Sequence, residues 1–266
     1  MSLPEPASDS IALVTGASSG IGEQFARQLS EMGYRVALVA RSADRLERLA
    51  EELGGPDRAV VIATDLAVPE DRDRLAARLE ELGAKVEILV NNAGFGIYQP
   101  FPEAGREAEL RQLRVLSEAV VDLMARYLPA MTERGRGAII NVASTAGFQP
   151  LPYNAGYAAA KAHVLLLSEG VHAEVKEQGV TVTAVCPGPV PSGFQDASDA
   201  HHIAAKLPGF TAVSPERVAR DGIRAAAGGK ISVIPGGAKV RVAYGPNRKL
   251  PRWIVLPVSK RLMTRS

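Results

Sequence analysis

The sequence predicts an α/β fold in which a doubly wound, seven-stranded parallel sheet carries helices on both faces. Three observations predict it: short apolar runs rich in β-branched residues recur along the chain, segments with helical spacing separate them, and a glycine-rich turn follows the first run. Because the runs are apolar almost throughout, both faces of the sheet are expected to be buried. We expect one domain over residues 1–266, with residues 1–10 as a flexible lead-in.

Seven runs carry the predicted strands. They are IALVTG from Ile11, RVALVA from Arg35, AVVIATD from Ala59, VEILVNNAG from Val86, GAIINVAS from Gly137, VTVTAVCPG from Val180 and KISVIPG from Lys230. Between them, segments such as SADRLERLAEEL place leucines at positions 46, 49 and 53, which gives a helix one buried stripe. Two regions break the alternation. Residues 189–215 are expected to form a lid over a substrate, and residues 239–266 form a basic tail with eight Lys and Arg and no acidic residue.

Composition excludes several classes of protein. Apolar residues make up 46% of the chain and charged residues 23%, which is ordinary for a soluble globular protein. The net charge of +2 argues against nucleic acid as the main partner. No apolar run approaches the ~20 residues of a membrane span, and the first residues lack the features of a secretory signal. Cys186, the only cysteine, ends a buried run, so we expect a structural thiol and a reducing cytoplasm.

The first predicted strand is followed by a glycine-rich turn and a helix. Gly16, Gly20 and Gly22 lack a Cβ, so backbone N–H groups there can approach a pyrophosphate at the helix N-terminus. In this position the turn indicates the nucleotide site of a Rossmann-type domain. The second predicted strand ends at Ala40 and Arg41, where a carboxylate would favour NAD and a cation accommodates the 2′-phosphate of NADP. Arg41 therefore favours NADP; the alternative is a solvated loop charge.

The segment YNAGYAAAK spaces Tyr153, Tyr157 and Lys161 four residues apart, which in a helix stacks them along one face. A phenol has a pKa of about 10 and is a poor proton carrier at neutral pH unless a positive charge favours its anion. Lys161 lies one turn from Tyr157 and two turns from Tyr153, so the spacing favours Tyr157 for chemistry. The alternative for this motif in isolation is a packing helix with a solvated lysine.

Taken together, the motifs resemble the short-chain dehydrogenase/reductase family in its single-domain form. The matching segments are TGASSGIG at 15–22, TDL at 64–66, NNAG at 91–94, INVAS at 140–144, Tyr157 with Lys161, and PGPVPS at 187–192. The resemblance implies an oxidoreductase that moves a hydride between NADP(H) and a small-molecule carbonyl or secondary alcohol. It also implies a homo-oligomer, either a dimer or a tetramer.

Ser144, Tyr157 and Lys161 are the catalytic residues that the resemblance implies. Reduction of a ketone places negative charge on its oxygen, which calls for a hydrogen-bond donor and a proton source. Ser144, at the carboxyl end of its strand, would be the donor and Tyr157 the acid. The Lys161 ammonium would lower the pKa of Tyr157 and bond the nicotinamide ribose.

The resemblance also implies the residues that bind the cofactor. Asp65 would contact the adenine, Asn91 and its neighbours would line the groove, and residues 187–192 would flank the nicotinamide, with Ser192 where the family usually has a threonine. The full set is Gly16, Ser18, Ser19, Gly20, Ile21, Gly22, Arg41, Asp65, Asn91, Ala93, Gly94, Tyr157, Lys161, Pro187, Gly188, Val190 and Ser192. The candidate walls of the substrate pocket are Phe95, Ile97, Phe148 and Tyr153.

One position departs from the family's pattern. Many members carry an asparagine in the helix after NNAG, where a local distortion holds a water that links the lysine to solvent. Here that position is Leu116, between Val115 and Ser117. Another water route, slow turnover, or a nucleotide-binding regulatory or scaffold protein with impaired catalysis would each account for it. Retention of Ser144, Tyr157 and Lys161 argues against the last.

Two weaker signals remain. The histidines lack neighbouring carboxylates or cysteines at ligand spacing, so no metal site is expected. In the basic tail, Trp253, Ile254, Val255 and Leu256 lie between the charges. They would either touch an anionic membrane or acidic partner, or cover the substrate side or a subunit contact while the charges face water. The prolines at 246, 251 and 257 are expected to interrupt any long amphipathic helix.

Overall fold

The computed structural model describes residues 3–191, 212–248 and 250–264. Over these residues seven strands form one sheet in the order β3-β2-β1-β4-β5-β6-β7, and every neighbouring pair is parallel. The strands are β1 (Ser10–Thr15), β2 (Arg35–Ala40), β3 (Ala59–Ala63), β4 (Lys85–Asn91), β5 (Gly137–Val142), β6 (Val180–Val185) and β7 (Ser232–Val233). Each falls on its predicted run, with β1 and β4 beginning one residue earlier, which confirms the doubly wound parallel fold.

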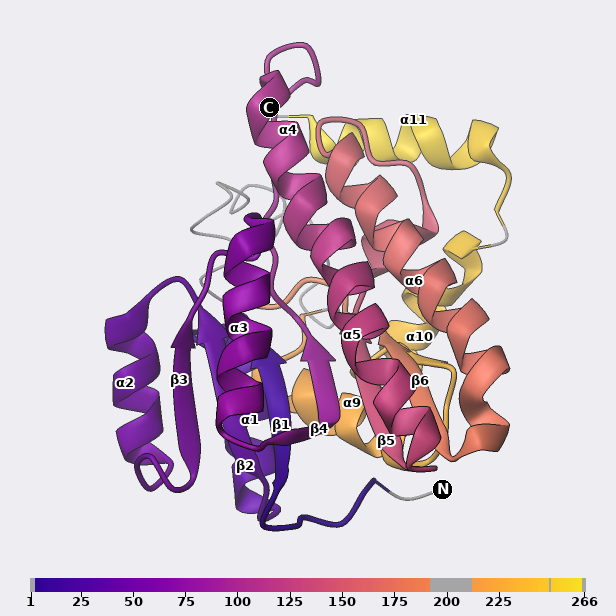
Figure 1. The fold of residues 1–266 in the computed structure, drawn as a ribbon. Helices are drawn as coiled ribbons and strands as arrows, with labels where there is room; N and C mark the ends of the chain where they lie inside the picture. The colour runs from indigo at the N-terminus through magenta and orange to yellow at the C-terminus, as the bar shows by residue number, and fades with distance from the viewer. Residues whose placement is uncertain (1–2, 192–211, 249, 265–266) are drawn as a thin grey trace.

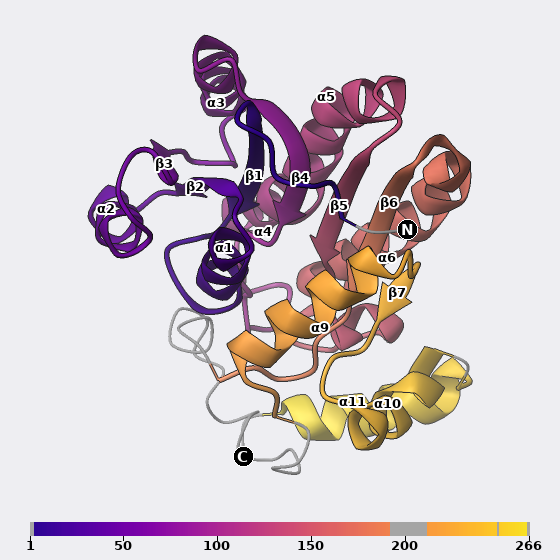
Figure 2. The same ribbon diagram turned by 90° about the horizontal axis from the view of Figure 1, so that it is seen from below.

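Helices cover both faces of the sheet, as Figure 2 shows from below. One layer is α1 (Gly20–Glu31), α2 (Ala43–Glu52) and α9 (Pro215–Ala227); the other is α3 (Pro69–Glu81), α5 (Ala119–Glu133) and α6 (Ala155–Val175). Alternate side chains of a strand therefore enter different cores. In β1, Val14 packs in the core with Phe25 of α1, and Leu13 packs in the core with Leu75 of α3.

The seventh strand is much shorter than the run that predicts it. Only Ser232 and Val233 pair with β6. After Ile234 comes Pro235, which has no N–H to donate, and Gly236 and Gly237 take φ values of 102° and 88°, which turn the chain away from the sheet.

All but one of the remaining helices in the described residues gather at the carboxyl ends of the strands. Those at this end are α4 (Arg106–Leu113), the π-helical turn η1 (Arg114–Glu118), the 3-10 turns η2 (Thr145–Phe148) and η5 (Gly245–Arg248), α10 (Ala238–Tyr244) and α11 (Arg252–Met263). The 3-10 turn η3 (Lys176–Gln178) lies away from this end. Figure 1 shows α11 lying across the end of the sheet toward which the strands point. The basic tail therefore forms two helices above the sheet.

Two of the predicted segments have a limited description. Most of the expected lid, residues 192–211, lies outside the described residues, and so does Ser192. In the lead-in, Leu3 is buried and the Tyr34 hydroxyl donates to the Pro4 carbonyl, so the described part of this segment packs against the body of the protein.

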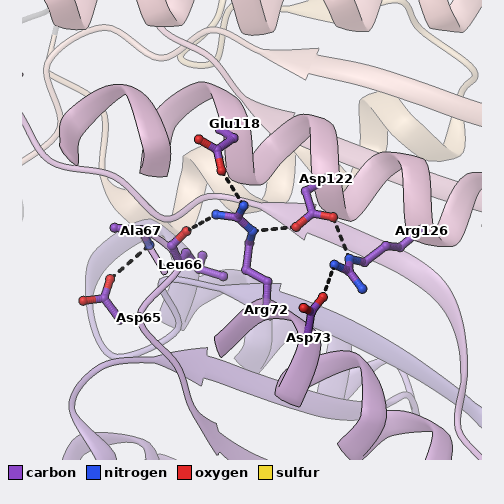
Figure 3. A network of polar contacts seen from close by, with 8 residues as sticks. All are labelled: Asp65, Leu66, Ala67, Arg72, Asp73, Glu118, Asp122 and Arg126. Carbon is purple, nitrogen blue, oxygen red and sulfur yellow. Dashed lines mark hydrogen bonds and ion pairs between the residues drawn. The ribbon is translucent and has the colours of Figure 1, made fainter. Parts of the chain in front are cut away.

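Arg72 links three segments on one side of the sheet (Figure 3). Its side chain, on α3, is 4% exposed. Nε donates to Asp122 of α5 at 2.5 Å, Nη2 to Glu118 of η1 at 2.5 Å, and Nη1 to the Leu66 carbonyl at 2.7 Å. Arg72 thereby fixes η1 and the segment after β3 relative to α3.

Candidate functional site

A cavity of about 740 Å³ opens at the carboxyl ends of the strands, beside the point where the strand order reverses between β1 and β4. It brings together most of the residues that the sequence predicts for a cofactor site and for catalysis. The predicted residues that line it are Gly16, Ser18, Ser19, Gly20, Ile21, Arg41, Asp65, Ala93, Gly94, Phe95, Ser144, Tyr157, Lys161, Pro187, Gly188 and Val190. Gly22, Asn91, Ile97, Phe148 and Tyr153 do not line it.

The glycine-rich turn shapes one end of the cavity. Gly16 has a φ of 67°, and a Cβ there would lie 2.7 Å from Asn92 Nδ2 and 2.9 Å from the Ala93 Cα. Gly22 allows the start of α1 to pack closely on the turn, because a Cβ on it would lie 2.2 Å from the Gly16 carbonyl oxygen. Ser19 is the N-cap of α1 and makes no side-chain cap bond. The turn thus presents the first N–H groups of α1, which fits a pyrophosphate.

Asn92, not Asn91, is the asparagine that faces the cavity. Asn91 is the last residue of β4 and points into the protein, where its Nδ2 donates to Asn141 Oδ1 of β5 at 2.9 Å. Asn92 points the other way, and its Nδ2 donates to the Thr15 carbonyl at 3.0 Å. The prediction that Asn91 lines the groove is therefore wrong, because it placed the side chain on the wrong side of the strand.

Charged residues line the cavity end beyond β2 and β3. Arg41 and Arg45 both line it, and Arg45, in the first turn of α2, supplies a second cation that the sequence analysis missed. Its place in the first turn of the predicted helix, directly after the second strand, was the signal that could have found it. Asp65 accepts from Arg111 Nη2 at 2.5 Å and from the Ala67 amide at 3.0 Å. Burial would raise the pKa of Asp65, but these hydrogen bonds outweigh it and lower the pKa.

Ser144, Tyr157 and Lys161 meet on the wall between the two ends of the cavity. Ser144 follows β5, accepts from the Ala146 amide at 3.1 Å, and lies within hydrogen-bonding reach of the Tyr157 hydroxyl. Tyr157 and Lys161 lie one turn apart on α6. Lys161 Nζ donates to the Val142 carbonyl at 2.6 Å and lies 5.8 Å from the centre of the Tyr157 ring.

Burial controls the protonation of both α6 side chains. Tyr157 keeps some surface open to the cavity, yet the surrounding protein desolvates its hydroxyl and raises its pKa. The neighbouring Tyr98 raises it further and the hydrogen bond with Ser144 opposes the rise. Burial lowers the pKa of Lys161 to about 8, with weak opposition from Cys186. The expected net lowering of the Tyr157 pKa is therefore not found, because desolvation prevails.

Leu116 fills the space beside the lysine. The helix is distorted here into the π-helical turn η1, and Leu116 is fully buried within it. A Cβ on Gly94 would lie 2.7 Å from Leu116 Cδ2 and 3.8 Å from Lys161 Nζ. The helix distortion that the family resemblance implies is present. The residue at this position, Leu116, has an apolar side chain that cannot form a hydrogen bond with a water.

Only Phe95 of the four predicted substrate-pocket residues lines the cavity. Phe148 is 4% exposed and packs in the core between the sheet and the helices. Tyr153 precedes Asn154, the N-cap of α6, and has a φ of 65°. Helical spacing therefore does not apply between Tyr153 and Tyr157, so the prediction that Tyr153 stacks on the same helix face as Tyr157 and Lys161 is wrong, and Tyr153 does not line the cavity.

Several cavity residues on the substrate side were not predicted. Tyr98 is enclosed next to Tyr157, and burial raises its pKa to about 12 while contact with the Asn154 side chain opposes the rise. The remaining apolar walls include Leu151, Leu250, Ile254, Val255, Val258, Leu262 and Met263, most of them on α11. Of these, Ile254 and Val255 belong to the tail segment for which the sequence offers the substrate side as one of its alternatives, and both line the cavity. The near-helical spacing of the walls on α11 was a usable signal, which the nearby prolines obscured.

As expected, Pro246 and Pro251 lie where the tail breaks between α10 and α11, but α11 continues through Pro257, contrary to the expectation for that proline. Pro251 is the N-cap, where no intrahelical N–H is needed. Pro257 leaves the Trp253 carbonyl without its helical donor, and Trp253 lies on the solvent face, where water can bond that carbonyl. The cost of the proline is therefore reduced.

Among residues 3–191, 212–248 and 250–264, no group of three or more His, Cys, Asp and Glu side chains is placed to hold a metal ion. No helix within the same ranges has both the length and the apolar character needed to span a membrane.

The sequence and the structure were compared with known proteins. The profile of the family described as short chain dehydrogenase matches residues 10–202. The very-long-chain 3-oxoacyl-CoA reductase of Anas platyrhynchos is 34% identical over 226 residues, which cover 80% of this chain and 67% of that protein.

Two solved structures share the fold over most of their length. A short-chain dehydrogenase from Sphingobium yanoikuyae in complex with NADPH superposes with a TM-score of 0.77 at 29% identity, covering 94% of this chain and 92% of that one. The 3-ketoacyl-(acyl-carrier-protein) reductase of Brucella melitensis, complexed with NADH, has a TM-score of 0.75 at 28% identity, with 86% and 97% covered.

Proposed function

Because this chain belongs to the short-chain dehydrogenase/reductase family and is an oxidoreductase, we propose that it moves a hydride between NADP(H) and a carbonyl or secondary alcohol, with Tyr157 as the acid and base. One observation carries the proposal. Ser144, Tyr157 and Lys161 meet on the wall of a cavity whose far end holds the glycine-rich turn and two arginines. A pyrophosphate held at that turn leaves the middle of the cavity for the reacting groups.

The residues present fit the proposed cofactor. The turn at Gly16 and Ser19 offers uncapped N–H groups to the pyrophosphate, and Lys161 and Gly188 line the section that would hold the nicotinamide and its ribose. The bound cofactor would supply or accept the hydride. Everything else in the reaction falls to this chain's own side chains.

Ser144 and Tyr157 are placed to manage charge and protons on the substrate oxygen. Both offer hydroxyl hydrogens at one point of the cavity wall, where they would stabilise negative charge developing on that oxygen. Burial keeps the Tyr157 hydroxyl protonated at neutral pH but raises its pKa, which makes it a weaker acid; the proposed role therefore needs the Lys161 ammonium to favour the Tyr157 anion as the proton leaves. Lys161, held by the Val142 carbonyl, fixes a positive charge on the same helix one turn away.

The preference for NADP over NAD rests on the two arginines. Arg41 and Arg45 supply positive charge at the cavity end beyond β2, where the 2′-phosphate would lie. Of the two structural relatives described above, one was solved with NADPH and the other with NADH, so the arginines carry the argument. The chain is further proposed to be a cytoplasmic dimer or tetramer.

The cofactor preference is tested by titration with NADPH and NADH, followed by nicotinamide fluorescence. Removing a cation should weaken only the cofactor that carries the extra phosphate. We expect Arg41→Ala, and Arg45→Ala to a smaller extent, to weaken NADPH binding about tenfold, equivalent to about 1.4 kcal/mol, and to leave NADH unchanged. Equal losses for both cofactors would contradict the assignment.

The catalytic role is tested with Tyr157→Phe. The variant keeps the ring and loses the proton, so we expect turnover of a carbonyl panel with NADPH to fall by about 10²–10⁴-fold while NADPH binding is retained. Leu116 gives the rival hypothesis, a nucleotide-binding regulatory or scaffold protein. Tight NADPH binding with no turnover of any panel member by the wild type would favour that rival.

A further inference from the structure

The helix α11 has apolar residues on two different sides. Ile254, Val258 and Leu262 recur at intervals of four residues and line the cavity. Trp253 and Leu256 point elsewhere, and their side chains are exposed to the extent of 76% and 42%. Neither of these two lines the cavity. Their exposure is therefore not explained by the substrate side.

Neighbouring residues extend this surface. Val242 of α10 is 74% exposed, and the basic residues Lys239, Arg241, Lys260 and Arg261 are exposed on the same two helices. Over residues 239–266 the chain has eight Lys and Arg and no Asp or Glu, although its net charge is only +2. We call the exposed side of α10 and α11, with these residues, the basic apolar surface.

We propose that the basic apolar surface docks the protein on an anionic lipid bilayer, with the indole of Trp253 at the interface. A tryptophan ring is favoured where an apolar environment meets water, and Lys and Arg beside it are attracted to anionic headgroups. The helix would lie along the membrane and not across it, because it has 12 residues and carries charges around its outer side.

The charge distribution favours a bilayer over a second copy of the chain. A symmetric dimer through this surface would place each patch against its own copy, so many positive charges would face an equal number of like charges. An anionic bilayer instead offers negative charge and an apolar interior within the same few ångströms, matching both components of the surface. An acidic protein would match the charges alone.

The experiment uses the full-length protein and its own tryptophan. Trp253 is the only tryptophan in the chain, so its emission reports directly on this surface. We would add vesicles of phosphatidylcholine alone, or of phosphatidylcholine with phosphatidylglycerol, and follow emission, acrylamide quenching and co-sedimentation. We expect a blue shift, protection from quenching and co-sedimentation with the anionic vesicles only, all reversed by added salt.

Two double variants separate this surface from general attraction. Lys260→Glu with Arg261→Glu changes the charge on α11, and Arg74→Glu with Arg78→Glu makes the same change in net charge on α3, away from α11. We expect the α11 pair to lower vesicle partitioning at least about tenfold and the α3 pair to change it much less.

Three results would overturn the proposal. Equal effects of the two pairs would show that net charge alone drives binding. Equal partitioning into neutral and anionic vesicles would remove the electrostatic basis. Blue, unquenched emission without vesicles would show that protein, either this chain or a second copy, already covers Trp253.

Discussion

Lys161 is a charged side chain held in a buried position. Its pKa of about 8, against 10.5 for an ordinary lysine, means that folding disfavours its ammonium form. Below about pH 8 Lys161 is charged in both the folded and the unfolded state, so the folded state is destabilised by the full desolvation cost of the buried ammonium group. Between about 8 and 10.5 only the unfolded state binds the proton, so wild-type stability rises with pH.

This cost predicts the effect of Lys161→Met, which removes the charge and keeps a similar apolar stem. We expect the variant to lose turnover. At neutral pH its free energy of unfolding should exceed that of the wild type by on the order of 2 kcal/mol, after the lost hydrogen bond to the Val142 carbonyl is taken into account. Urea unfolding of both proteins from pH 7 to 10 measures it. The gap should narrow as the pH rises above 8, and a constant gap would contradict the electrostatic explanation.

At this scale the sequence predicts the catalytic residues better than the pocket walls. The spacing of Tyr157 and Lys161 suffices because both lie inside one helix. Tyr153 could not be placed from spacing, since the position of the N-cap at Asn154 decides whether it shares their face. Asn91 and Asn92 are adjacent and chemically identical, so only the point where β4 ends distinguishes the buried one from the one at the cavity.

Arg72 connects elements on which the cofactor end of the cavity depends. It holds Glu118 of η1 and Asp122 of α5 against α3, and it bonds the Leu66 carbonyl next to Asp65 (Figure 3). We expect Arg72→Met to lower the free energy of unfolding by about 1–3 kcal/mol, because it leaves the Leu66 carbonyl without its donor and removes one of the two guanidinium groups that bond Asp122, which keeps Arg126.

Arg74→Met provides the matched control for this prediction. Arg74 lies on the same helix and pairs with Asp71, but its side chain is 72% exposed. We expect a change within about 0.5 kcal/mol, as for most exposed ion pairs. Urea unfolding compares the two variants, and similar losses in both would show that the Arg72 network adds nothing beyond a surface contact.

The elements themselves follow closely from the sequence, with two exceptions. Strand runs buried on both faces are apolar throughout, so periodicity identifies them even without a partner. β7 is overestimated because the run continues in Ile234 while Pro235 and two glycines end the pairing. The effect of Pro257 on α11 is overestimated because the lost hydrogen bond falls on the Trp253 carbonyl, which lies on the solvent side of the helix where water can bond it.

At the scale of the whole molecule, α9 must fit against α1 within the helix layer that covers one face of the sheet. A Cβ on Gly222 would lie 2.9 Å from Phe25 Cζ and 3.0 Å from Val185 Cγ2, so the helices approach as closely as they do only because of this glycine. We expect Gly222→Ala to lower stability by about 1 kcal/mol through overpacking, despite the better helix propensity of alanine.

Gly170→Ala is the control. Gly170 lies within α6, and a Cβ there would meet no atom within 4 Å. We expect this variant to be more stable by about 0.5–1 kcal/mol, the ordinary gain of alanine in a helix. Thermal or urea unfolding measures both. If Gly222→Ala is stabilising to the same extent, the packing of α9 on α1 is looser than the structure indicates.

The contact between α1 and α9 also governs how the chain reaches its native state. α1 ends at Glu31 and α9 begins at Pro215, so one core closes only after a very long loop has been brought together. During synthesis the apolar side of α1, with Phe25 and Leu29, is complete long before its cover emerges. The nascent chain therefore passes through an interval in which aggregation competes with folding, and a chaperone that shields α1 would raise the yield of native protein.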